Sequence, residues 1–424
     1  MSEATDLQSQ RLEMPQDPYS VPLDKIDVAQ PHLFSNGWHW GYFERLRAEA
    51  PVHYCATGNE GPYWSVTKYE DIVYVDSNHG LFSSEPAIVL GDPEEDFELE
   101  MFIAMDQPKH DVQRKVAQPV VAPQNLKVLE ATIRQRVCDI LDSLPVGESF
   151  NWVDKVSIEL TTQMLATLFD FPFEDRRKLT RWSDVATTDP EQDQSIVSSE
   201  EERRAELFEC LEYFNRLWAE RAGNGGGNDL ISMLSNGEST KDMVNRPLEY
   251  LGNLILLIVG GNDTTRNSIS GGVLALNQNP AEYDKLRANP ALIPNMVSEI
   301  IRWQTPLAYM RRTANEDTEL GGKTIRKGDK IAMWYISGNR DESAIDNANQ
   351  FLIDRPKARQ HLSFGFGIHR CMGNRLAEMQ LRILWEEIMR RFETIEVVGE
   401  PQRIFSPFVH GYAELPVVLH PKTA

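Results

Sequence analysis

A glycine-rich loop that delivers one cysteine is the feature that most constrains this chain. Residues 364–373 read FGFGIHRCMG and lead directly into an amphipathic segment that is predicted to be helical. Cys371 is therefore expected in the first turn of a helix, where free N–H groups and the helix dipole favour a thiolate over a thiol. The glycines allow the backbone to pass close beneath a flat ligand, where a Cβ atom would clash. A buried structural cysteine beside a tight turn is the plainer alternative.

The three other cysteines, Cys55, Cys138 and Cys210, are widely spaced and form no C-x-x-C pair. This pattern argues against a disulfide framework and a zinc site, and it favours a reducing compartment. The first 24 residues are polar and resemble neither a signal peptide nor a membrane anchor. The longest apolar run, residues 254–259, is far too short to span a bilayer. We therefore expect a cytoplasmic protein without a membrane anchor.

The chain is strongly acidic, because 64 Asp and Glu residues against 43 Lys and Arg residues give a formal net charge of −21. A surface of this charge repels phosphate backbones and anionic lipids, so we expect no nucleic-acid partner. The charged fraction of 25% and the hydrophobic fraction of 41% are those of a folded globular protein.

Helical periodicity dominates the chain from about residue 124 onward. A long helix is predicted over residues 247–278, since Pro247 suits a first helical turn. Further helices are predicted over residues 294–303 and 373–392, and short strands over residues 51–54, 63–67, 318–320, 324–326 and 330–334. The expected fold is mainly α with small β-sheets. We expect one large domain over residues 31–424, preceded by a polar N-terminal extension over residues 1–30.

The cysteine loop has the spacing F-x-x-G-x-H-x-C-x-G. This spacing resembles the haem-binding loop of the cytochrome P-450 family, and the resemblance in motif order and spacing extends from about residue 38 to residue 419. It implies a single haem-thiolate domain that binds haem b (iron protoporphyrin IX), with Cys371 as the axial ligand of the iron. Such a thiolate donates electron density that promotes O–O cleavage. The other loop residues implied to contact haem are Phe364, Gly365 and Gly373.

Three further residues match a structural network of the same family. Glu299 and Arg302 fit its E-x-x-R helix, with the two charges on one helix face. Arg355 stands where the family has a third, arginine member. The resemblance implies that this network fixes the segment before the cysteine loop. Taken alone, such a charge pair is common on solvated helices.

The predicted long helix contains Gly260-Gly261-Asn-Asp263-Thr264. Two consecutive glycines inside a helix cost roughly 2 kcal/mol relative to alanines, so a compensating reason is expected. Hydroxyls beside the glycines can bond carbonyls of the preceding turn and open the helix locally. The resemblance implies that Gly260 and Gly261 leave room for O₂ over the haem, and that Asp263 and Thr264 are the catalytic acid–alcohol pair that relays protons. Close helix packing with a surface aspartate is the alternative.

Haem propionates require cations and hydrogen-bond donors. His110 and Arg114 resemble the family's H-x-x-x-R pair, and Arg312 and His369 match two further propionate contacts. The neighbouring Arg311 leaves the register of the strand arginine open by one position. Each of these residues, taken alone, would more often be a surface charge.

The segment from Gly260 to Val273 resembles the bacterial soluble, ferredoxin-dependent alkane hydroxylases of this family. This resemblance implies a monooxygenase that hydroxylates the terminal carbon of medium-chain alkanes, alcohols or fatty acids. Hydroxylation of terpenoids or steroids is one alternative, and a peroxygenase or a haem-based gas sensor is another. Leu256, Val259 and Leu307 are candidates for the wall of an apolar substrate channel, although ordinary core packing explains each of them equally well.

The same resemblance implies separate electron donors, namely a 2Fe–2S ferredoxin and an FAD-containing, NAD(P)H-dependent ferredoxin reductase. A basic patch could dock the ferredoxin on this acidic protein. Its candidate residues are Lys109, Arg114, Lys115, Arg370, Arg375 and Arg382. Arg114 cannot serve fully both in this patch and at a propionate.

Overall fold

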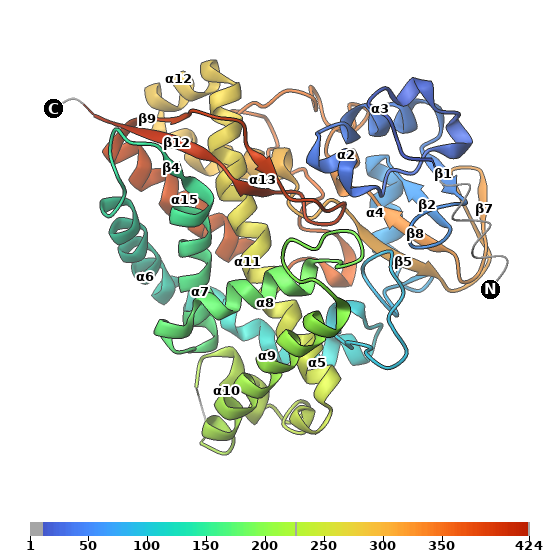
Figure 1. The fold of residues 1–424 in the computed structure, drawn as a ribbon, viewed down its shortest axis with the longest axis horizontal. Helices are drawn as coiled ribbons and strands as arrows, with labels where there is room; N and C mark the ends of the chain where they lie inside the picture. Colours follow the sequence, from blue (N-terminus) through green and yellow to red (C-terminus); the bar gives the residue numbers. More distant parts are fainter. Residues whose placement is uncertain (1–11, 225–226, 423–424) are drawn as a thin grey trace.

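The computed structural model describes residues 12–224 and 227–422, in which one long helix organises the fold. α11 spans Pro247–Gln278, the bounds predicted from the sequence, and crosses the middle of the molecule (Figure 1). Pro247 lies in its first turn, where the missing N–H costs no helical hydrogen bond. α7 (Glu159–Phe169), α8 (Arg177–Thr187) and α13 (Ile293–Gln304) pack along α11.

The other α-helices of the described residues are α2 (Pro31–Ser35), α3 (His39–Glu49), α4 (Tyr69–Ser77), α5 (Lys109–Ala117), α6 (Pro123–Asp142), α9 (Glu200–Arg221), α10 (Leu230–Asn236), α12 (Pro280–Ala288), α14 (Tyr335–Gly338) and α15 (Asn374–Arg391). The strands are β1 (Val52–Cys55), β2 (Tyr63–Val66), β3 (Phe82–Ser83), β4 (Phe150–Asn151), β5 (Met310–Ala314), β6 (Thr318–Leu320), β7 (Lys323–Ile325), β8 (Lys330–Met333), β9 (Phe392–Val397), β10 (Gln402–Arg403), β11 (Tyr412–Glu414) and β12 (Pro416–Pro421).

The largest sheet has the strand order β1-β2-β8-β5-β3 and lies at the N-terminal end of the molecule (Figure 1). β1 and β2 form the predicted antiparallel hairpin, and β8 joins β2 in parallel. A three-stranded sheet, β4-β12-β9, and two two-stranded pairs, β6-β7 and β10-β11, complete the strands of the described chain. The predicted fold class, mainly helical with small sheets, is confirmed. Phe392 was predicted to end the last helix, but it is the first residue of β9, because α15 stops at Arg391.

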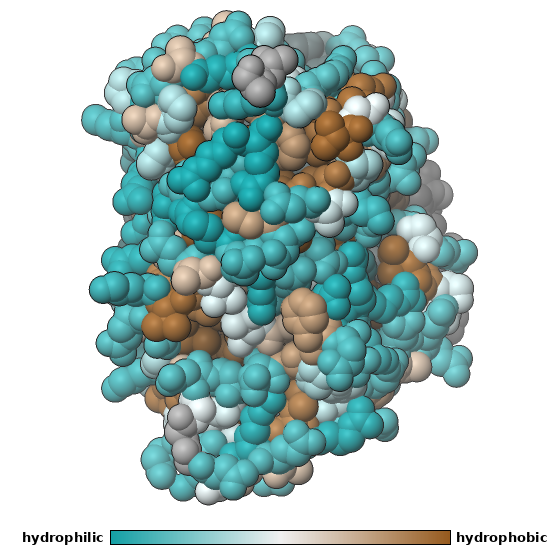
Figure 2. Space-filling model, turned by 90° about the vertical axis from the view of Figure 1, so that its left-hand side faces the viewer, coloured by the Kyte–Doolittle hydropathy of each residue, from teal (hydrophilic) through white to brown (hydrophobic). Residues whose placement is uncertain are grey.

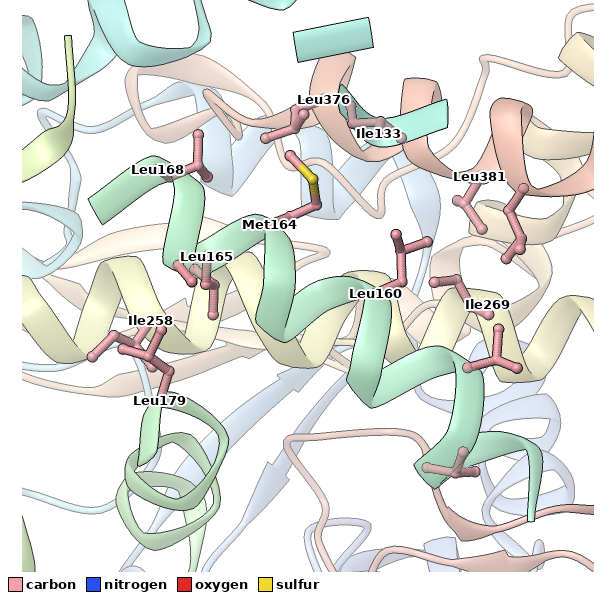
Figure 3. Packing of buried hydrophobic residues seen from close by; sticks show 14 of the residues in the cluster. Ile133, Leu160, Met164, Leu165, Leu168, Leu179, Ile258, Ile269, Leu376 and Leu381 are labelled. Atoms are coloured by element: carbon pink, nitrogen blue, oxygen red, sulfur yellow. The ribbon is translucent and has the colours of Figure 1, made fainter. Parts of the chain in front are cut away.

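The main core forms where three helices meet. Figure 3 shows Leu160, Met164, Leu165 and Leu168 of α7 between side chains of α11 and α15. α7 thereby connects α11 to α15, the helix that follows Cys371. Apolar burial of this kind contributes roughly 25 cal/mol per Å² of surface removed from water.

The domain boundary expected at residue 31 remains a prediction. Residues 1–11 lie outside the described part of the chain, and the segment from residue 12 to residue 30 packs onto the body. Met14, Val21 and Ile26 are buried in one cluster with Leu33 and Phe34. This part of the chain therefore contributes to the core.

No helix among the described residues is long and apolar enough to cross a membrane. The face shown in Figure 2 is mainly hydrophilic, and its hydrophobic patches are small and separated.

Candidate active site

A deep cavity lies between α11, the loop before α15, and side chains from α5, α7 and β5. About 1510 Å³ of space, including the opening, is free of protein atoms. Most of the wall is apolar, and its charged groups are Asp76, Arg114 and Arg312. The predicted site residues that line the cavity are Arg114, Leu256, Gly260, Gly261, Thr264, Leu307, Arg312, Phe364, Gly365, His369, Cys371 and Gly373.

Backbone geometry fixes the position of Cys371. Its N–H donates to the carbonyl of Phe364 at 2.8 Å, which closes the loop on itself. Gly365 and Gly367 have φ values of +66° and +62°, which a residue with a Cβ atom rarely adopts. A Cβ atom on Gly367 would also overlap the backbone carbonyl of Asp76. The two glycines are thus required by the turn.

Cys371 does not lie in the first turn of the helix, as the sequence predicted, because α15 begins at Asn374. The backbone N–H groups of Gly373 and Asn374 nevertheless act on the sulfur, as does the positive charge of Arg114. Burial outweighs them and raises the pKa of the Cys371 thiol above its ordinary value. The exposed surface of Cys371 borders the cavity. A cation bound there would favour the thiolate.

The cavity-facing side of α11 presents Gly260, Gly261 and Thr264. A Cβ atom on Gly260 would have no other atom within 4 Å, whereas one on Gly261 would contact Leu165 at 2.6 Å. The Thr264 hydroxyl donates to the carbonyl of Gly260 at 2.9 Å. The predicted hydroxyl–carbonyl bond is therefore present. The helix does not open here as predicted, because α11 continues through this segment as regular helix.

Asp263 lies outside the cavity wall. Its side chain is fully buried and forms an ion pair with Arg266 at 2.8 Å. Arg266 also pairs with Asp184 of α8 at 2.7 Å, and the Asp184 side chain is 28% exposed. Burial raises the pKa of Asp263, and the Arg266 guanidinium opposes that rise. Asp263, Arg266 and Asp184 thus form a row of charged side chains that leads from the buried Asp263 to the partly exposed Asp184.

Cationic and histidine side chains gather on the cysteine side of the cavity. Arg114 and Arg312 reach the wall from α5 and β5. His110 lies behind His369, and their ring centroids are 4.2 Å apart. The Nε2 atom of His110 and both ring nitrogens of His369 are buried without a hydrogen-bond partner among the described residues. Burial lowers the pKa of both histidines.

The structure shows which of the two adjacent arginines on β5 faces the cavity. Arg312 points to the cavity, whereas Arg311 bonds the backbone of residues 89–91 and the carboxylate of Asp92 at 2.8 Å.

These features fit a planar, anionic, metal-containing group such as haem. The Cys371 sulfur would hold the metal, the open space beside Gly260 would leave room for a small ligand, and the unpartnered histidine nitrogens and the arginines would bind carboxylate groups.

Asp76 is a buried residue of this site that no sequence motif indicated. Its carboxylate accepts hydrogen bonds from Arg312 at 2.7 Å, from the Tyr335 hydroxyl at 2.8 Å and from the N–H of Phe366 at 2.7 Å. Asp76 thereby joins α4, β5 and the cysteine loop. Only the packing of distant segments reveals this role.

The predicted charge network is assembled away from the cavity. Glu299 binds Arg302 at 2.7 Å and Arg355 at 2.9 Å, and all three side chains are buried. The two arginines also donate to the backbone carbonyls of residues 339, 346, 347, 348 and 350. The network thus connects α13 to backbone carbonyls within residues 339–350, which precede the cysteine loop.

Two of the three predicted channel residues, Leu256 and Leu307, line the cavity, whereas Val259 does not and packs against the core. The helical period explains this difference, since Leu256, Gly260 and Thr264 follow one another at intervals of four. Apolar lining residues that the sequence did not indicate include Phe102, Ile103, Leu165, Leu168, Leu257 and Met310.

The basic patch is smaller than predicted. Lys109 pairs with Glu100, and Arg382 pairs with Glu130 and Glu386. Arg114 faces the cavity. In the described chain, Lys115, Arg370 and Arg375 are exposed and form no ion pair.

Residues 95–416 match the family model of cytochrome P450. Linalool 8-monooxygenase of Pseudomonas putida is 36% identical over 94% of this chain and 100% of its own length. A methyl-branched lipid omega-hydroxylase of Mycobacterium tuberculosis is 32% identical over 94% of this chain and 96% of its own. The solved structure of CYP153D17 from Sphingomonas sp. PAMC 26605 is 49% identical, with a TM-score of 0.87 over 94% of this chain and 100% of that chain.

Proposed function

The chain belongs to the cytochrome P450 family, and from this premise we propose that it hydroxylates the terminal carbon of medium-chain alkanes, alcohols or fatty acids. As a family member it is a haem-binding monooxygenase. Bound haem supplies the activation of O₂. The protein itself contributes the sulfur ligand, the contacts at the haem edge, a proton path and the orientation of the substrate.

Thr264 and Asp263 are proposed to supply protons from two sides of α11. The Thr264 hydroxyl faces the cavity and is held by the Gly260 carbonyl, so it can bond a group above that glycine. Asp263 is buried beside Arg266, and its raised pKa suits a carboxyl that takes up and returns a proton. Rotation of its side chain from Arg266 towards the cavity would connect the two residues.

The observation that supports an apolar chain as substrate is the composition of the cavity wall. Its charged groups, Asp76, Arg114 and Arg312, bond one another or the cysteine loop, and the side chains around Leu256 and Leu307 are apolar. Terminal C–H bonds are stronger than secondary ones, so selectivity requires a wall that holds the chain end over the iron. The relative named a lipid omega-hydroxylase supports the same reading.

Hydroxylation of terpenoids or steroids is the second candidate, which the relative named for linalool supports. One experiment separates the two substrate classes. Octane, octanoic acid and a steroid are titrated into the haem-loaded protein, and the haem spin state and the products are measured. We expect octane or octanoic acid to shift the spin state and to yield the terminal alcohol. A shift with the steroid alone would contradict the proposal.

The electron donors are proposed to be a 2Fe–2S ferredoxin and an FAD-containing, NAD(P)H-dependent reductase, which dock near Lys115, Arg370 and Arg375. Product formation that requires NADH, ferredoxin and reductase would support this proposal. Efficient turnover with hydrogen peroxide alone would instead favour a peroxygenase, and an absence of turnover with either system would favour a gas sensor.

A further inference from the structure

A second cavity lies apart from the cysteine site, between α3, the C-terminal half of α11, the end of α13 and the β10-β11 pair. About 990 Å³ of space, including its mouth, is free of protein atoms. None of its lining residues belongs to the cysteine cavity. Its wall is largely polar and charged, unlike the apolar wall described above.

Positive charge dominates this second wall. Three arginines, Arg47, Arg340 and Arg403, line it together with one carboxylate, Glu44. Arg47 donates to Ser337 and lies near the carboxylates of Glu44, Asp341 and Glu342, so its charge is compensated. Within the described residues, Arg403 has neither an ion pair nor a side-chain hydrogen bond.

Arg340 is the most deeply buried of these three arginines. Its side chain is buried, and its guanidinium lies 4.4 Å from the ring centroid of Trp40 and 3.3 Å from that of Trp303. It donates one hydrogen bond, to the Trp303 carbonyl at 3.3 Å, while its Nε has no partner in the described chain. No carboxylate of the described residues forms an ion pair with it.

Two histidines of the same wall add no charge near neutral pH. Burial lowers the pKa of His39 and of His410, the latter to about 4. The Nε2 atom of His39 is buried and has no partner in the described chain. Burying a cation without a counter-ion is costly, and ring contacts offset only part of that cost. An anion in the cavity would compensate Arg340 and Arg403.

We propose that this cavity binds a phosphate group, carried either by inorganic phosphate or by a small organic phosphate ester. Two uncompensated guanidinium groups match the charge of a phosphate near neutral pH, which is about −1.5 to −2. The planar fork of arginine also suits phosphate oxygens. A carboxylate would leave one guanidinium without a counter-charge. Gln278 and Asn349 of the same wall offer further donors, whereas the Gln304 amide already donates to the His410 carbonyl at 2.8 Å.

Isothermal titration calorimetry on the full-length, haem-loaded protein at constant ionic strength tests this site. Inorganic phosphate, glycerol 3-phosphate and sodium chloride are titrated separately. We expect saturable binding of phosphate or of the ester, with one site per chain, and none of chloride. Tighter binding of phosphate would identify the free ion as the ligand, and tighter binding of the ester would identify the organic form.

Arg403→Gln is the informative variant, because Arg403 is only half-buried and its side chain has no hydrogen bond or ion pair in the described chain, so we expect the fold to tolerate the change. It should weaken binding by about 10-fold or more, the usual effect of losing a charge-assisted hydrogen bond. Arg340→Gln should do the same. Arg216→Gln is the matched control, because it removes the same charge from an exposed residue of α9 that forms no ion pair in the described chain. No saturable binding of either phosphate compound, unchanged affinity in Arg403→Gln, or equal weakening in Arg216→Gln would overturn the proposal.

Discussion

Thr264 and Asp263 are neighbours in α11 but face different surroundings. The Thr264 hydroxyl lines the cavity and bonds the Gly260 carbonyl at 2.9 Å, whereas Asp263 is buried against Arg266 at 2.8 Å. One residue turns the helix by about 100°, and this turn directs the Asp263 side chain away from the cavity that Thr264 lines. The cavity therefore contacts one member of the pair directly, and the other stands between the cavity and the protein exterior.

Replacing Thr264 by alanine should uncouple oxygen consumption from hydroxylation. Positioned acid–base groups usually contribute about 100-fold or more, and a water molecule in the cavity can replace a hydroxyl in part. We expect product formed per NADH consumed to fall about 10-fold, with hydrogen peroxide released instead. Thr187→Ala, which removes a similar hydroxyl–carbonyl bond at the end of α8, is the control. Equal coupling in Thr264→Ala and wild type would rule out the proposed relay.

Removing the Glu299 carboxylate should destabilise the fold and the haem site together. Glu299→Gln leaves Arg302 and Arg355 buried with their charges uncompensated, which typically costs about 3–5 kcal/mol. Denaturant unfolding should show this loss, and the haem content of the purified protein should fall. Glu238→Gln, which breaks the exposed pair with Lys241, should change neither quantity. Wild-type stability in Glu299→Gln would contradict a structural role for the network.

Asp76 is predicted to retain haem by holding Arg312 and the cysteine loop. Asp76→Asn weakens the bonds to Arg312 and to the N–H of Phe366, so haem should transfer faster to an acceptor protein, by about 10-fold for a lost charge-assisted bond. Asp92→Asn removes the partner of Arg311, which points away from the cavity, and should leave the rate unchanged. If both variants release haem at the wild-type rate, Asp76 has no such role.

The cavity wall predicts which leucines set substrate affinity. Leu256→Ala and Leu307→Ala remove apolar contact area and should each weaken octane binding by about 10-fold, as expected for a few lost methylene contacts. Val259→Ala should leave octane binding unchanged, because Val259 packs against the core outside the wall. Spin-state titrations measure all three affinities. Equal weakening by Val259→Ala would place the substrate elsewhere.

Local signals predicted much of this molecule. The bounds of α11 follow from Pro247 and a long helical period, and the cysteine loop follows from glycines that the turn requires at Gly365 and Gly367. Both features are determined by residues that are close together in the chain, so a local sequence pattern is enough to predict them.

Features that depend on distant packing were not predictable. Asp76 meets Arg312 across 236 positions, and no local pattern marks that pair. The choice between Arg311 and Arg312 depends on which face of β5 meets the cavity, and a shift of one residue in a strand exchanges the faces. The second, cationic cavity likewise combines side chains from five separate segments.

The central claim is that the Cys371 sulfur is the ligand of haem iron, and the absorption spectrum of the reduced, carbon-monoxide-bound protein tests it most directly. Wild-type protein and Cys138→Ala should both show the absorption band of a sulfur-ligated haem, since Cys138 lies on α6 outside the cavity wall. Cys371→Ala should lose this band completely. Its persistence in Cys371→Ala would contradict the account.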